Sequence, residues 1–242
     1  MPRENRNKTV EGAIAVKAPQ GIDFEAARQT MVESQLRTAG VNDRRLIAAM
    51  GSVPRERFVS PANRALAYMD DAVPVEAGSG EMPRYLLAPM VLARMIQTAD
   101  LGADERVLVV GCASGYSVAV LSELVREVIG VESDDALAAQ AESNLAALSA
   151  TNTRIFRGPL TDGAASEGPY DLILLGGSVP AIPTALEEQV KEGGRIVGVV
   201  SNGMQGTVFL FVKTDGELAA LPQFSAGAKP LPGFVREAVF DF

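Results

Sequence analysis

The chain has 242 residues, of which 47% are hydrophobic, and its 22 basic and 30 acidic side chains give a net charge of −8. This length and composition suit one globular unit with a sizeable core. The acidic balance argues against a nucleic-acid partner, which normally requires a basic face. There is no histidine and only one cysteine, Cys112, which excludes imidazole chemistry, an internal disulfide and a cysteine-rich metal site. We therefore expect no bound metal.

The N-terminal residues carry no recognisable targeting signal. Residues 1–22 lack an apolar segment followed by a small-residue cleavage site, and no apolar run in the chain approaches the ~18 to 20 residues that span a bilayer. We therefore expect a cytoplasmic protein without a membrane partner. The four basic side chains of residues 1–22 would suit a basic arm, but a disordered extension is the commoner explanation of such a terminus.

Residues 23–90 predict a helical cap that leads into an irregular segment. Asp23 can cap a helix that runs to about Ala39, and Asn42 and Asp43 offer a cap for a second helix. Two prolines break the following stretch into short pieces. The last twenty residues of this part contain three prolines and two glycines, so we expect little regular structure there.

From residue 91 onward, helical patterns alternate with buried strands. One helix is expected over residues 183–194, with Pro183 near its start and Gly193 or Gly194 near its end. Near-continuous apolar strands separated by helices indicate a parallel sheet that is covered on both faces. The expected strands are at residues 106–111, 127–132, 153–158, 170–177 and 195–200.

The C-terminal part changes from alternating helices and strands to strands alone. The segment "GTVFLFVKTDGELAAL" is typical of two strands joined by a turn at Asp215-Gly216. The final "FVREAVFDF" predicts a further strand. An α/β sheet that ends in an antiparallel pair is therefore expected.

The loop after the first strand has the composition of a ligand-binding turn. Gly111 and Gly115 allow the backbone to approach a ligand closely, and a helix that begins near Ser114 directs free N–H groups to the same place. The second strand ends at Glu132, 21 residues after Gly111, where a carboxylate can accept hydrogen bonds from ribose hydroxyls. The loop consists of Gly111, Cys112, Ala113, Ser114, Gly115 and Tyr116.

This loop favours a nucleoside without a phosphate chain. It lacks the second and third glycines of the dinucleotide fingerprint and the lysine of a phosphate-binding loop, so S-adenosylmethionine is the expected ligand. The alternative is a tight strand-to-helix turn without a ligand, with Glu132 as a solvated helix cap. Cys112 is either a reactive thiol or, more simply, a small residue that fits the turn. Tyr116 either borders the ligand or belongs to the core.

After the first 25 residues, the chain resembles the protein-L-isoaspartate O-methyltransferase family. The segments "MVESQLRTAGVNDRRLIAAMGSVPRERFV" and "LAYMDDAVPV" carry this resemblance ahead of the loop. The segments "RVLVVGCASGYSVAVLSELVREVIGVE" and "GPYDLILLGGSVPAIPTALEEQVKEGGRIV" carry it through the sheet. The "VPRERFV" and "LAY" pieces are specific to this family, whereas other methyltransferases of the same fold share only the later part.

The resemblance implies a fold and a reaction. The fold is α/β, a Rossmann-like seven-stranded methyltransferase sheet, mostly parallel with an antiparallel C-terminal pair, plus a helical N-terminal cap. Residues 23–90 would form the cap and the substrate loop, and residues 91–242 the S-adenosylmethionine-binding domain. Members methylate the carboxylate of isoaspartyl residues in proteins or peptides and release S-adenosylhomocysteine. That carboxylate is already ionised at neutral pH, so no general base is required and catalysis is mostly positioning.

The resemblance also implies a cofactor site, and this chain departs from the family pattern in it. Val109 stands where members usually carry an acid two positions before the first glycine, and Pro159 replaces the acid of a G-D-G segment. The expected cofactor-binding residues are Gly111, Cys112, Ala113, Ser114, Gly115, Tyr116, Glu132, Ser133, Gly158, Pro159 and Leu160.

The substrate loop departs from the family pattern as well. The family sequence T-I-S-Q-P aligns with residues 85–89, so Leu87 takes the place of the serine, and Tyr85 retains one hydroxyl. Arg84 can pair with a substrate carboxylate, although an exposed loop arginine is the commoner case. These changes leave two alternatives to a working isoaspartyl methyltransferase. One is a weak or silent member that binds an adenosyl ligand or a protein partner, and the other is a methyltransferase with a different acceptor.

Overall fold

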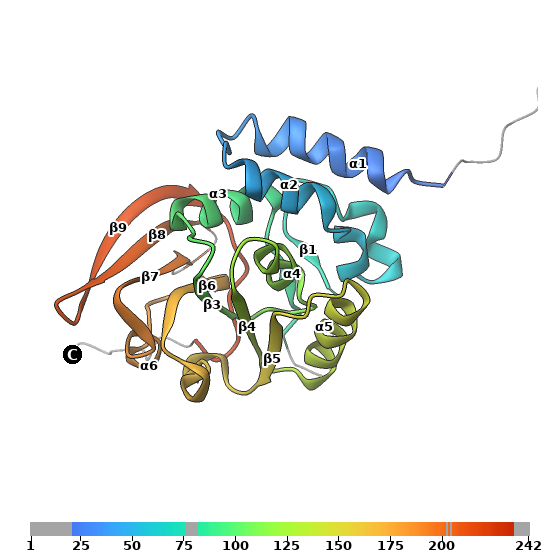
Figure 1. The fold of residues 1–242 in the computed structure, drawn as a ribbon. Helices are drawn as coiled ribbons and strands as arrows, with labels where there is room; N and C mark the ends of the chain where they lie inside the picture. Colours follow the sequence, from blue (N-terminus) through green and yellow to red (C-terminus); the bar gives the residue numbers. More distant parts are fainter. Residues whose placement is uncertain (1–20, 76–81, 202, 204, 235–242) are drawn as a thin grey trace, which may run out of the picture.

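A computed structural model of the chain describes residues 21–75, 82–201, 203 and 205–234. Its centre is a seven-stranded sheet with the strand order β5-β4-β3-β6-β7-β8-β9 (Figure 1). The strands pair in parallel from β5 to β7, whereas β8 and β9 are antiparallel. This arrangement confirms the predicted fold class. The strands are β3 (Arg106–Val110), β4 (Glu127–Glu132), β5 (Thr153–Arg157), β6 (Tyr170–Val179), β7 (Val190–Val200), β8 (Gly206–Thr214) and β9 (Glu217–Ala226).

The sheet divides the interior into two apolar layers because successive strand residues point to opposite faces. Along β3, Val107 and Val109 belong to one layer, while Leu108 and Val110 belong to the other. Three helices cover the first layer, namely α3 (Pro89–Ala99), α4 (Tyr116–Ser122) and α5 (Asp135–Ala147). The second layer is covered by the short helices η4 (Leu160–Asp162) and α6 (Thr184–Glu187), by Ala164, which precedes η5 (Ala165–Glu167), and by Leu231.

The cap consists of short helices that pack against α3 and α4 (Figure 1). The carboxylate of Asp23 accepts a hydrogen bond from Ala26 N, and that of Asp43 accepts from Arg45 N, so both predicted helix starts are confirmed. The first helix changes to a wider π-helical turn and ends at Leu36. The cap elements are α1 (Phe24–Met31), η1 (Val32–Leu36), α2 (Arg44–Ser52), η2 (Arg55–Phe58) and η3 (Pro61–Leu66).

The segment predicted to be irregular contains one short ladder. The two-residue strands β1 (Val73–Pro74) and β2 (Tyr85–Leu86) pair in antiparallel fashion, and Val75 N donates to Arg84 O at 2.9 Å. The ladder therefore fixes the backbone of Arg84 and Tyr85, which begin the predicted substrate loop.

The helix predicted over residues 183–194 is confirmed at its start, after Pro183, and is wrong beyond Glu188. The helix α6 is four residues long, and β7 already begins at Val190, which pairs with Tyr170. Gly193 has a φ of +74°, which an α-helix does not allow but an irregular strand does. Lys191 also forms an ion pair of 2.7 Å with Asp171 in the neighbouring strand. Sheet pairing has therefore prevailed over the local helical pattern.

The C-terminal hairpin is confirmed. Asp215 and Gly216 join β8 to β9 with φ values of 55° and 82°, as a two-residue hairpin turn requires. The strand predicted at the C-terminus lies, except for Phe234, outside the described residues, and so does the predicted N-terminal extension up to residue 20. None of the helices in the described ranges is long and apolar enough to cross a membrane.

Strand β6 runs directly beside the loop that follows β3. A Cβ atom on Gly176 would lie 2.3 Å from the carbonyl oxygen of Gly111, far inside the normal contact distance. Because the obstacle is backbone, no side-chain rotation can relieve it. Only a glycine at position 176 therefore allows β6 to lie this close to the loop after β3.

We predict that Gly176→Ala lowers the free energy of unfolding by about 1–3 kcal/mol, because overpacking of a tight site forces the backbone apart. Urea denaturation followed by circular dichroism measures the change. The control is Gly203→Ala, where a Cβ atom meets no heavy atom within 4 Å and the expected change is within about 0.5 kcal/mol. Equal stabilities of the two variants would contradict the close approach.

Candidate active site

The predicted loop lies where the order of the sheet reverses. Strands β4 and β6 flank β3 on opposite sides, so the carboxyl end of β3 opens at a topological switch point, where ligands bind in folds of this kind. Gly111 and Gly115 have φ values of 76° and 95°, and the loop needs glycine for both. The helix α4 begins at Tyr116, two residues later than predicted, because Gly115 is left-handed and cannot belong to it.

Glu132 is buried at the end of β4 and organises the loop. Its exposed fraction is 0%, and its Oε2 accepts a hydrogen bond of 2.8 Å from Ala113 N. Its Oε1 accepts from Ser133 N at 2.9 Å and from Asp134 N at 3.2 Å. The alternative of a solvated helix cap is therefore wrong. Asp134, not Glu132, caps α5 by accepting from Ala136 N.

Arg84 is the second charged residue in the cleft, the region between the loop after β3, Glu132 and Leu231. Its guanidinium Nη1 donates to Glu132 Oε1 at 2.5 Å, and its side chain is 6% exposed. The expectation of an exposed loop arginine is therefore wrong. The predicted pairing of Arg84 with a substrate carboxylate stays a prediction, because here the guanidinium pairs with a carboxylate of the same chain. An ion pair with so little solvent contact is only weakly screened by salt.

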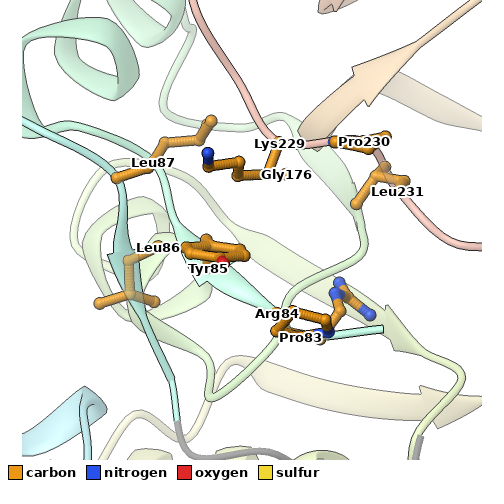
Figure 2. A pocket seen from close by; sticks show the side chains of 10 residues that line it. Pro83, Arg84, Tyr85, Leu86, Leu87, Gly176, Lys229, Pro230 and Leu231 are labelled. Carbon is orange, nitrogen blue, oxygen red and sulfur yellow. The ribbon is translucent and has the colours of Figure 1, made fainter. Parts of the chain in front are cut away.

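Arg84 and Leu231 fill the space above the first glycine of the loop. A Cβ atom on Gly111 would lie 2.6 Å from Leu231 Cδ2 and 2.9 Å from Arg84 Nη2. Figure 2 shows these two side chains close together on one side of the pocket. Two cavities that are both lined by Tyr85, Leu87 and Gly176 are about 10 Å³ and about 20 Å³ in volume. Each is large enough for about one water molecule.

The other predicted residues of the loop are packed into the protein. Ser114 is fully buried, and its hydroxyl donates to Phe58 O in the cap. The ring of Tyr116 packs at 5.4 Å from that of Phe58, while the Arg55 guanidinium lies 4.6 Å from its centroid. Tyr116 is thus a core residue that also lines the cavity of about 20 Å³. Burial, helped by the nearby Glu132 carboxylate, raises the pKa of the Cys112 thiol.

The predicted residues after β4 and β5 lie at the rim. Ser133 and Pro159 are exposed, whereas Leu160 is buried in the second apolar layer. Gly158 N donates to Glu132 O at 3.2 Å, which brings the two strand ends together. Val109 is fully buried in the first layer, so the residue that replaces an acid is a core residue.

The predicted substrate loop is held by a hydrogen bond from the cap. Arg55 Nη2 donates to Leu87 O at 2.7 Å, and Leu87 itself is 7% exposed. Tyr85 is half-buried, and Lys229 Nζ lies 5.5 Å from the centroid of its ring. Figure 2 shows Lys229 extending toward Leu87 and Tyr85 from the C-terminal segment.

Sequence reasoning missed three of these residues. Arg55 was visible as an arginine in the "VPRERFV" segment, yet its burial follows only from packing. Lys229 and Leu231 lie in a segment without a hydrophobic period, so no sequence signal placed them at the cleft.

Fold and site together define a protein with a Rossmann-like methyltransferase fold and an acidic residue at the nucleoside-binding edge of the sheet. The sequence model of the protein-L-isoaspartate(D-aspartate) O-methyltransferase family matches residues 26–225. The chain belongs to this family, as the sequence predicted. Members of the family are enzymes that use S-adenosylmethionine as the methyl donor.

Relatives and solved structures agree with this assignment. The chain is 34% identical over 201 residues to the protein-L-isoaspartate O-methyltransferase of Koribacter versatilis, covering 83% of this chain and 88% of the relative. It is 40% identical over 188 residues to protein-L-isoaspartate O-methyltransferase 2 of an Anaeromyxobacter species, covering 78% and 74%. A solved protein-L-isoaspartate O-methyltransferase superposes with a TM-score of 0.75 at 26% identity, covering 85% of this chain and 66% of that structure.

The cofactor of the family does not fit the cleft in the conformation described. Pockets for ligands of this size hold roughly 300 Å³ or more, whereas the cavity at the loop holds about 20 Å³ and the cavity beside Arg84 about 10 Å³. The loop and the Glu132 carboxylate match a nucleoside in chemistry. The space is taken by Arg84 and Leu231. The cofactor-binding role of the predicted residues therefore stays a prediction.

We predict that Cys112 reacts with a thiol reagent on the order of a hundredfold more slowly than an exposed cysteine, because the thiol is buried and its raised pKa keeps it protonated. Ser166 is exposed, so Ser166→Cys supplies a matched fast thiol in the same molecule. Absorbance at neutral pH should show one fast and one slow phase, and unfolding in urea should merge them. Two fast phases in the folded protein would contradict the burial of Cys112.

Proposed function

We propose that this chain transfers a methyl group from S-adenosylmethionine to the carboxylate of an isoaspartyl residue in a protein or peptide, in the cytoplasm. The supporting observation is that the family match spans both the cap and the sheet, residues 26–225. The proposal places the adenosyl group over Gly111 with its ribose at Glu132, so binding requires Arg84 and Leu231 to move.

The acceptor needs to be bound and oriented, because its carboxylate is ionised at neutral pH without the help of a base. Lys229 is exposed beside the half-buried Tyr85 and provides a positive charge for an anionic acceptor. An open hollow of about 390 Å³ lies next to it, lined by Asp71, Ala72, Gly203 and residues 227–230. We place the acceptor peptide in this hollow, with its carboxylate directed past Lys229 toward the loop.

Two observations support the alternatives. Leu87 brings no hydroxyl to the position where the family pattern has serine, which favours a different carboxylate as acceptor. The closed cleft favours a member that binds a protein partner without turnover. One alternative expects methylation of a different carboxylate, and the other expects no methylation at all. A single methyl-transfer experiment therefore separates both from the main proposal.

We predict transfer of labelled methyl to an isoaspartyl peptide and no transfer to the same peptide with a normal aspartate, which is the matched control. The reaction should be run with enzyme in the micromolar range and S-adenosylmethionine up to the millimolar range, so that weak cofactor binding is not limiting. Labelled methyl on a small carboxylate but not on the isoaspartyl peptide would point to another acceptor. No transfer to either substrate would refute the methyltransferase proposal.

A further inference from the structure

We infer that Arg84 occupies the place of the cofactor's ribose and locks the cleft in a closed state. The inference rests on the proposed function and names the residue that regulates access to its site. Three features carry it, namely the acceptor capacity of Glu132, the space above Gly111 and the anchoring of the chain around both.

The Oε1 atom of Glu132 has no room for another strong donor. A carboxylate offers about four lone-pair sites. Oε1 accepts from Arg84 Nη1, from the amides of Ser133 and Asp134 and, at 3.4 Å, from the Ser133 hydroxyl, whereas Oε2 accepts from Ala113 N alone. The amides are fixed by the loop and by the start of α5. A ribose hydroxyl that donates to Oε1 therefore takes the place of Arg84 Nη1, which forms the shortest of these bonds and can leave by side-chain rotation.

The same side chain also takes the space that the adenosyl group needs. Arg84 Nη2 and the Leu231 methyl groups lie where any atom placed on Gly111 would go. The backbone under both is anchored, since Val75 N donates to Arg84 O and Leu231 N donates to Ser178 O, both at 2.9 Å. The cleft can therefore open by rotation of the Arg84 and Leu231 side chains, without a change in the backbone.

A lock of this kind has a defined thermodynamic consequence. The apparent affinity for a ligand equals the intrinsic affinity multiplied by the fraction of molecules in the state that can bind it. Breaking the buried pair is part of every binding event, so cofactor affinity is reduced for as long as Arg84 is an arginine. Removal of the guanidinium should restore it, and the three backbone amides would still hold Glu132.

The test is the affinity for S-adenosylhomocysteine, measured by calorimetry in the absence of acceptor. We expect Arg84→Gln to bind about tenfold or more tightly than the unchanged protein. The control is Arg106→Gln, which removes an ion pair of 2.6 Å with Glu127. This pair joins the first residues of β3 and β4, at the end of the sheet opposite to Glu132. Arg106→Gln should leave the affinity unchanged. Circular dichroism confirms that both variants are folded.

Other outcomes overturn the lock in distinguishable ways. If Arg84→Gln binds no more tightly but raises the KM for the isoaspartyl peptide, Arg84 holds the acceptor instead. If the unchanged protein already binds as tightly as the variant and methylates the peptide, the lock fails while the proposed function stands. If neither protein binds at millimolar concentration, both the lock and the proposed function fail.

A second measurement needs no variant. Phenylglyoxal modifies accessible arginines, and mass spectrometry identifies the modified sites. We expect Arg84 to be protected in the free protein and to become at least several-fold more reactive when S-adenosylhomocysteine is added, the reverse of ordinary ligand protection. Arg64, which is exposed, should react equally in both states. Added protection of Arg84 by the ligand would overturn the inference.

Discussion

The carboxylate of Glu132 joins the parts of the molecule that meet at the cleft. It receives the Ala113 amide from the loop after β3, two amides from the start of α5 and the guanidinium of Arg84 from the segment before α3. A buried carboxylate without such partners would be costly. The shape of the loop, the position of α5 and the closure of the cleft therefore depend on the same two oxygen atoms.

The cap is joined by hydrogen bonds to the two loops at the cleft. Arg55 is fully buried and donates to Ala67 O within the cap and to Leu87 O in the substrate loop. Burial lowers its pKa, and the adjacent Tyr116 ring partly opposes that effect. The Ser114 hydroxyl adds a hydrogen bond from the loop after β3 to Phe58 O in the cap. Displacement of the cap would thus disturb both loops at once.

The sequence predicted those features that are set by local pattern. The continuous strands, the Asp215-Gly216 turn, and Glu132 at the end of β4 all follow from residue periodicity and turn chemistry. The pairing of Arg84 with Glu132 could not be predicted, because the residues are 48 positions apart and meet through a two-residue ladder that has no periodicity. The C-terminal part of the predicted helix ending at Gly194 failed for a related reason, since pairing with β6 decided its conformation.

Under the proposed function, the charges around the cleft give the Arg84–Glu132 pair a direct effect on a cationic methyl donor. The positions where the family pattern has two further acids hold Val109 and Pro159, so Glu132 is the acid left at the nucleoside loop. With Arg84 on it, that charge is neutralised, and a guanidinium beside a cationic sulfonium is unfavourable. Rotation of Arg84 away from Glu132 would free one negative charge for the donor. The backbone of Arg84 stays fixed by the ladder, so this rotation would change the groups that the guanidinium meets without moving the strand that follows it.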